Sequence, residues 1–162
     1  MTDEEIHAGG CQCGAIRFRM TGKPANSSIC HCRMCQKAFG NLFAPLVTPQ
    51  KGKFEWTRGR PKHFRSSNHV LRGFCSNCGT PLTYEAPDGI GLALGAFDDP
   101  SRLPPTVQYG IEARVDWFDR LPELPGHVTE DDGEAYPYVL DIVSCQHPDH
   151  DTETWTTKEG QS

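Results

Sequence analysis

The sequence predicts a mainly β protein with one or two short helices. Three observations support this fold class. Short apolar segments recur at intervals of roughly 8–12 residues, which is typical of all-β folds. Only two stretches, residues 33–39 and 98–103, have the character of a helix. Seven of the eight cysteines fall into three tight clusters, at residues 11–13, 30–35 and 75–78, where metal ions could join distant strands.

The first predicted strand has a clear period of two. Ile16, Phe18 and Met20 share one face, while Arg17 and Arg19 point to the other. Similar short segments, separated by Gly and Pro turns, follow along the chain. The predicted strands cover residues 15–20, 42–47, 53–57, 70–74, 82–85 and 90–96. Between the first two, residues 33–39 are predicted to form a helix that ends at Gly40, because glycine suits a left-handed helix cap.

The chain is predicted to contain one domain, residues 1–125, and a peripheral acidic extension, residues 126–162. A length of 162 residues is enough for one domain with its own core. The composition shifts after Pro122, and the acidic run at 130–134 is typical of a linker or loop. Residues 138–143 are apolar enough to add one late strand. The last dozen residues are polar enough to form a loose tail.

The composition argues against several partners. Lys and Arg number 16 against 21 Asp and Glu, for a net charge of -5. An acidic protein gains no general attraction from phosphate backbones, so we expect no nucleic-acid partner. Residues 1–5 lack the basic and apolar segments of a secretory signal. The longest apolar run, around residues 89–97, is far short of the ~20 residues that cross a bilayer. We therefore expect a cytoplasmic protein with no membrane partner.

Clustered cysteines in a reducing compartment favour metal binding over disulfides. Eight cysteines in 162 residues is about 5%, below the roughly 8–10% of disulfide scaffolds. A bond from Cys11 to Cys13 would strain the chain, because only one residue separates them. A disulfide framework is nevertheless the alternative to metal binding, since the cysteine count is even.

Four cysteines are predicted to form a closed zinc site. Cys11 and Cys13 precede the first strand, and Cys75 and Cys78 form a C-x-x-C turn followed by Gly79. Four thiolates complete the tetrahedral coordination of a structural zinc ion, and its binding energy then stabilises the fold. Alternatively, the first pair is incidental, and Cys75 and Cys78 share a metal with sulfurs from the middle cluster.

Cys30, Cys32 and Cys35 are predicted to hold a second zinc ion with one position open to water or substrate. Three thiolates make zinc a weak Lewis acid, so we expect this site to hold a substrate thiolate as a nucleophile. His31 should point away from the ligands, because neighbours alternate in an extended segment, and we interpret it as a hydrogen-bonding or structural residue. The alternative is a second structural zinc whose fourth ligand would be His63, His69 or Cys145.

These motifs resemble those of the glutathione-dependent formaldehyde-activating enzyme family, also called the centromere-protein-V-like family. The similar segments are residues 10–18, 30–37 and 74–80, with later landmarks at 98–100 and 117–118. The resemblance covers residues 5 to 125. It implies several coiled short antiparallel sheets, similar to the Mss4-like class and stapled by zinc. It also implies a structural zinc on Cys11, Cys13, Cys75 and Cys78, and a second zinc on Cys30, Cys32 and Cys35.

Named members of that family condense glutathione with formaldehyde to S-hydroxymethylglutathione, formally as carbon–sulfur lyases. The resemblance therefore implies an enzyme with two zinc ions per chain, acting on a small thiol such as glutathione and a small aldehyde. No catalytic residue is expected beyond the ligands of the open site. A non-enzymatic zinc module that binds a partner is the alternative. Cations that could receive glutathione's two carboxylates, or be ordinary surface charges, are Arg33, Lys37, Arg58, Arg60 and Arg114.

Overall fold

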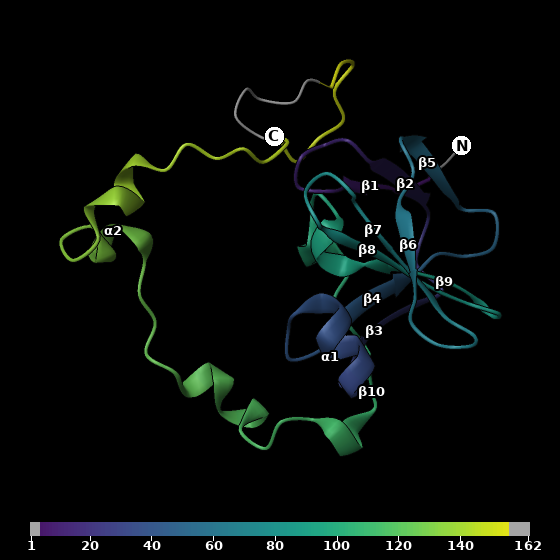
Figure 1. The fold of residues 1–162 in the computed structure, drawn as a ribbon, viewed down its shortest axis with the longest axis horizontal. Helices are drawn as coiled ribbons and strands as arrows, with labels where there is room; N and C mark the ends of the chain where they lie inside the picture. The colour runs from purple at the N-terminus through teal and green to yellow at the C-terminus, as the bar shows by residue number, and fades with distance from the viewer. Residues whose placement is uncertain (1–3, 156–162) are drawn as a thin grey trace.

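The computed structural model describes residues 4–155, so the outermost residues of the predicted tail lie outside the described part. Within it, ten strands form two sheets (Figure 1), which confirms the predicted mainly β class. One sheet has three strands in the order β1-β2-β5, and the other has seven in the order β10-β3-β4-β9-β8-β7-β6. The strands are β1 (Ile6–Gly10), β2 (Arg17–Thr21), β3 (Asn26–Cys30), β4 (Ala44–Thr48), β5 (Phe54–Arg58), β6 (Lys62–Arg65), β7 (Leu71–Phe74), β8 (Pro81–Ala86), β9 (Gly89–Ala93) and β10 (Val107–Tyr109).

The hydrophobic core lies where the small sheet packs on the larger one. Phe18 and Met20 of β2 are fully buried, as the period of two predicts, and they join Leu82 and Leu92 of the larger sheet in one cluster. The ring of Phe18 contacts that of Phe97 edge-on, with 5.0 Å between the ring centroids. Packing of aromatic rings at such distances adds to the free energy that burial alone provides.

The strand pairings are antiparallel with one exception among the described residues. β10 runs parallel to β3, whereas the family resemblance implied antiparallel sheets. The chain can make this parallel pair because residues 31–106, which include five strands of the larger sheet, lie between the two strands. β7 and β8 form an antiparallel pair, and the turn between them carries the C-x-x-C motif.

Arg17 departs from the expected outward orientation. Its side chain is only 3% exposed, because Asp98 accepts two hydrogen bonds from its guanidinium, at 2.7 and 2.5 Å. Asp151 accepts two more, at 2.8 and 3.1 Å. A buried guanidinium needs such partners, since an unpaired charge is costly to bury. Alternation along β2 alone could not reveal partners that lie 81 and 134 residues away.

The helices are short. α1 (Arg33–Phe39) is the predicted helix, and Gly40 ends it with a φ of 57°, in the left-handed region. Residues 98–103 contribute only a 3-10 turn, Pro100–Arg102, and the strand predicted over residues 90–96 ends at Ala93. The other elements are α2 (Thr129–Asp132) and the 3-10 helices Leu94–Ala96, Ile111–Ala113, Phe118–Glu123 and Pro137–Asp141. None of the helices within residues 4–155 has the length and apolar character that crossing a bilayer requires.

The late strand predicted over residues 138–143 is wrong. Pro137 begins a 3-10 helix there, and the side chains of Leu140, Ile142 and Val143 are exposed. After β10 the chain leaves the sheets in a long arc, which contains this segment, and returns beside the loop that follows β1 (Figure 1). A strand needs a neighbouring strand whose backbone it can pair with, and the described residues of this arc have no such neighbour.

The end of the described chain contacts the first cysteine pair. The His147 backbone N–H donates to the Gln12 carbonyl at 2.7 Å, and the Trp155 indole N–H donates to the Cys13 carbonyl at 2.5 Å. Trp155 packs on the main hydrophobic cluster. We define residues 146–155 as the C-terminal strap. The predicted domain boundary at residue 125 stays a prediction, and the strap adds long-range contacts that the sequence did not indicate.

Candidate metal centres

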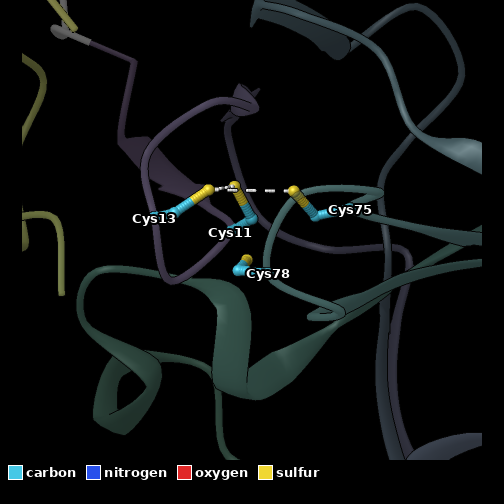
Figure 2. Close-up of side chains that lie close together, drawn as sticks. All are labelled: Cys11, Cys13, Cys75 and Cys78. Atoms are coloured by element: carbon cyan, nitrogen blue, oxygen red, sulfur yellow. Dashed lines mark hydrogen bonds between the residues drawn. The ribbon is translucent and has the colours of Figure 1, made fainter. Parts of the chain in front are cut away.

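Four cysteines from two distant segments lie together where the β1–β2 loop meets the β7–β8 turn. Cys11 and Cys13 occupy the loop between β1 and β2, and Cys75 and Cys78 occupy the turn between β7 and β8. Their four Sγ atoms all lie within 4.8 Å of one another, and the side chains converge on a common centre (Figure 2). Four sulfurs at such distances can share a tetrahedral ion with metal–sulfur distances of about 2.3 Å.

The turns around this group aim hydrogen-bond donors at the sulfurs. The backbone N–H of Ile16 donates to Cys11 Sγ at 3.2 Å, and the Asn77 side-chain amide donates to Cys13 Sγ at 3.1 Å. The Thr80 hydroxyl lies 3.1 Å from Cys78 Sγ. Burial raises the pKa of Cys78, but the hydrogen bonds from Thr80 and Cys13 outweigh it and lower that pKa to about 6. Donors of this kind stabilise a thiolate, which is the form that binds metal.

Three further cysteines form a second group at the junction of β3 and α1. Cys30 ends the strand, Cys32 caps the helix, and Cys35 lies in its first turn. Their three Sγ atoms also lie within 4.8 Å of one another. Burial raises the pKa of Cys35 to about 12, and Arg72 opposes this rise. Burial also acts to raise the pKa of Cys32, but hydrogen bonds from Cys35 and Cys30 hold it below the ordinary value.

A cavity of about 430 Å³ opens beside this three-cysteine group. Leu46, Val70 and Ile90 give it apolar walls, and Tyr84 and Tyr109 add aromatic rings. Arg72 is its one basic lining residue among those described. A cavity of this size with apolar walls and a few polar groups is typical of a small-molecule site. The four-cysteine group also borders a hollow, but residues of the strap line part of that one.

His31 is not part of either group. It is fully buried, its Nε2 lies 2.9 Å from the Gln108 side-chain oxygen, and its ring packs edge-on against Phe118 at 4.9 Å. This placement agrees with its interpretation as a structural residue between two cysteines. Its hydrogen bond ties β3 to β10, and so holds Cys30 and Cys32 on either side of it in place.

The three residues considered as a fourth ligand do not join the three-cysteine group. His63 binds Glu85 at the exposed edge of the large sheet, with 2.9 Å between Nε2 and the carboxylate. His69 is exposed in the turn between β6 and β7, and Cys145 is exposed near the strap. In the described part of the chain, no His, Asp or Glu side chain reaches the three sulfurs closely enough to complete their set.

The candidate cations for a thiol substrate lie away from the cavity. Arg58 donates to the Gly14 and Thr152 carbonyls near the strap, and Arg114 pairs with Asp119 at 3.1 Å. Lys37 lines an adjoining groove instead, between α1 and the strands β6 and β7. None of the five cations named from the sequence borders the cavity, namely Arg33, Lys37, Arg58, Arg60 and Arg114.

Arg72 is the polar residue that sequence reasoning missed. It lies in β7, at the same strand parity as Val70, and is only 7% exposed. The signal was present, because an Arg at a buried position of an alternating strand needs a partner or a function. Its partner, Cys35, is 37 residues away in sequence, so the pairing could not be read from spacing.

The fold and the two groups together define a class: a mainly β protein with one four-cysteine and one three-cysteine cluster, both fit for metal binding. The family model of the glutathione-dependent formaldehyde-activating enzyme matches residues 6–112. The chain therefore belongs to that family, and the resemblance noted from its motifs is confirmed.

Two further comparisons show proteins to which parts of this chain are similar. An uncharacterized lyase of Schizosaccharomyces pombe is 30% identical over 83 residues, which are 51% of this chain and 60% of that protein. This chain therefore spans about 60% of the length of the yeast protein, which is less than two thirds. A crystal structure of a Rhodobacter sphaeroides protein aligns over 62% of this chain and 98% of its own, at 18% identity and a TM-score of 0.49.

Proposed function

We propose that this protein is a lyase-type enzyme that joins a small thiol, such as glutathione, to a small aldehyde, such as formaldehyde. The observation that carries the proposal is the three-cysteine group, whose sulfurs face a cavity of about 430 Å³. Membership of the family and the lyase name of the yeast relative support the reaction type.

The two cysteine groups are proposed as zinc sites with different roles. Cys11, Cys13, Cys75 and Cys78 would close a structural site. A zinc ion on Cys30, Cys32 and Cys35 would offer a further coordination position that favours the thiolate form of a bound thiol. The chain's own residues shape what can enter: apolar side chains form part of the walls, and Arg72 places a positive charge beside the sulfurs.

The proposed reaction adds the thiol across the aldehyde carbonyl. A sulfur–carbon bond forms, the carbon–oxygen π bond breaks, and the thiol proton ends on the new hydroxyl oxygen. No oxidant or reductant is needed. The reverse reaction breaks the carbon–sulfur bond, which is why such an enzyme is classed as a lyase.

The test is to mix zinc-loaded protein with glutathione and formaldehyde and follow S-hydroxymethylglutathione by NMR. We expect a rate above the spontaneous one, and we expect Cys32→Ser to lose it. Cys145→Ser is the matched control, since Cys145 lies outside both groups, and it should keep the rate. A wild-type rate equal to the spontaneous rate would remove the proposal for this substrate pair.

A further inference from the structure

A buried arginine with unused hydrogen-bonding capacity stands beside the three-cysteine group. The Arg72 side chain leaves β7 and its Nη2 donates to Cys35 Sγ at 3.4 Å. Its Nε donates to Ser66 Oγ at 3.4 Å, and its guanidinium lies over the ring of Tyr84, 4.9 Å from the centroid. These three contacts fix the guanidinium in the wall of the cavity.

One end of this guanidinium has no partner. Arg72 Nη1 is buried, and no hydrogen-bond acceptor within residues 4–155 reaches it. No carboxylate of the described chain pairs with Arg72 either. The acidic residue that lines the same cavity is Asp88, which is exposed in the turn between β8 and β9. A buried donor on a charged group costs free energy when it stays unsatisfied, so an acceptor that reached Nη1 would remove this cost.

The anionic sulfurs do not account for this arrangement by themselves. They attract the positive charge of Arg72 through Nη2, but its other terminal nitrogen, Nη1, has no hydrogen-bond partner among the described residues. A guanidinium presents its two terminal nitrogens in the geometry that matches a carboxylate. A carboxylate bound at Nη1 would also compensate the charge that Arg72 carries into the protein interior.

We propose that Arg72 binds the carboxylate of the thiol substrate, so that the cavity selects short thiols with one carboxylate near the sulfur. The inference rests on the proposed function, because it assumes that the three-cysteine group receives a thiol. Since Nη2 contacts Cys35 Sγ, the guanidinium lies within about 6 Å of any metal held by that sulfur. The sulfur and the carboxylate of the substrate must then be separated by only a few bonds.

The rest of the cavity agrees with this substrate class. Leu46, Val70 and Ile90 can contact the methylene groups between the two ends. The cavity offers one buried cation, so a thiol with two carboxylates, such as glutathione, would place only one of them on a buried partner. Lys37, one of the cations named above, borders the adjoining groove and not this cavity.

The test compares two thiols that differ only at the far end, 3-mercaptopropionate and 3-mercaptopropan-1-ol. Their dissociation constants are measured by calorimetry on the zinc-loaded protein. We expect the carboxylate to bind on the order of tenfold more tightly or better, as charge-assisted hydrogen bonds allow. Propionate, which has no sulfur, should compete with 3-mercaptopropionate and not with the alcohol. Equal dissociation constants for the two thiols would overturn the inference.

Variants locate the effect. In Arg72→Gln the preference for the carboxylate should fall to about onefold, while Arg72→Lys should keep part of it. Arg65→Gln, an exposed arginine on the neighbouring strand β6, is the matched control and should keep the full preference. Comparing the ratio of the two constants between wild type and variant cancels the difference in acidity between the two thiols. Should the variants fail to hold zinc, the wild-type comparison and the propionate competition decide the matter.

The outcomes separate this inference from the proposed function. If both thiols bind equally tightly, the proposed thiol binding is supported and the proposed role of Arg72 is wrong. If neither thiol binds to the zinc-loaded protein, the proposed function itself falls, and the inference falls with it. If Arg72→Gln keeps the wild-type preference for the carboxylate thiol, another group binds the carboxylate and the inference is wrong.

Discussion

Single residues decide what each cysteine group can do. Around the four-cysteine group, Ile16 and Asn77 donate hydrogen bonds to the sulfurs, and the Thr80 hydroxyl lies 3.1 Å from Cys78 Sγ. Beside the three-cysteine group, Arg72 contacts one sulfur and lines the same cavity as the three cysteines. The first set of contacts suits a permanent structural ion, and the second suits exchange with a substrate.

A residue-scale prediction contrasts one cysteine from each group. Cys75→Ser should lower bound zinc from two ions to one per chain and reduce the free energy of unfolding by about 3 kcal/mol or more, because this site joins segments 62 residues apart. Cys32→Ser should also lose one ion but destabilise far less, since its group spans only six residues. Metal analysis and urea unfolding measure both quantities.

Cys145→Ser provides the control for that contrast and should retain two ions and wild-type stability. If Cys75→Ser and Cys32→Ser destabilise the protein equally, the division into a structural and a functional site is wrong. The zinc count and the stability are measured on the same samples, so a loss of metal is not mistaken for a loss of protein.

At this scale the sequence predicted the two cysteine groups well, because ligand spacing is a local property that survives folding. Cys11 and Cys13 could be paired with Cys75 and Cys78 by counting ligands alone. Arg72 escaped notice, since its role depends on a contact between β7 and α1 that no local pattern encodes. Its neighbours Tyr84 and Ser66 come from other segments for the same reason.

At the scale of elements, the C-terminal strap is held to β2 by an ion pair. Asp151 binds Arg17 at 2.8 Å and Arg19 at 3.4 Å. Burial alone would raise the pKa of Asp151, but the hydrogen bonds and charge of Arg17 lower it below the ordinary value of 3.8. A carboxyl whose pKa is lowered by folding stabilises the folded state above its unfolded pKa. The contribution disappears as the pH falls through the folded-state pKa.

The corresponding prediction concerns Asp151→Asn. At pH 7 the amides of the strap should exchange about fivefold faster than in the wild type, a modest effect because Asp151 is 40% exposed. As the pH falls below 3.8, wild type and variant should converge, since the wild-type carboxylate becomes protonated. Hydrogen–deuterium exchange at several pH values measures this. Glu153→Gln, which changes an exposed residue of the same strap, should have no effect, and a pH-independent difference would contradict the argument.

Elements with a strong local pattern were predicted and the others were not. The strand with Ile16, Phe18 and Met20 and the helix that ends at Gly40 both carry clear signals. β1, β3, β6 and β10 were missed. β1 ends in two glycines, and β6 is exposed at every position. Residues 138–143 have the composition of a strand, but Pro137 and the lack of a neighbouring strand give a 3-10 helix instead.

At the scale of the whole molecule, the chain forms a body of two sheets and an arc that is tied at both ends (Figure 1). Residues 115–143 of the arc hold eight acidic side chains and one Arg. Apolar side chains such as Tyr138 and Val143 are exposed along it. The arc therefore gains little free energy from burial, and its backbone is accessible.

Limited proteolysis should test this organisation. A protease should cut within residues 115–143 well before it cuts the sheets, because local opening there costs little. The C-terminal fragment should nevertheless stay bound to the body, held by the contacts of Asp151 and Trp155. Native mass spectrometry of the cut protein measures this. Immediate release of the fragment would show that the strap contributes no binding of its own.

The position of Trp155 should make its fluorescence sensitive to a metal ion held by the four-cysteine group. Its indole N–H bonds to the carbonyl of Cys13, one of the four clustered cysteines, and its ring packs on the core. When a chelator removes the ion from that cluster, the loop should loosen, and the indole should meet water. In a Trp56→Phe, Trp117→Phe background, fluorescence emission should then shift to the red in step with zinc release. A loss of metal at one end of the chain would thus be visible, without any added dye, from a ring that lies 142 residues further along the sequence.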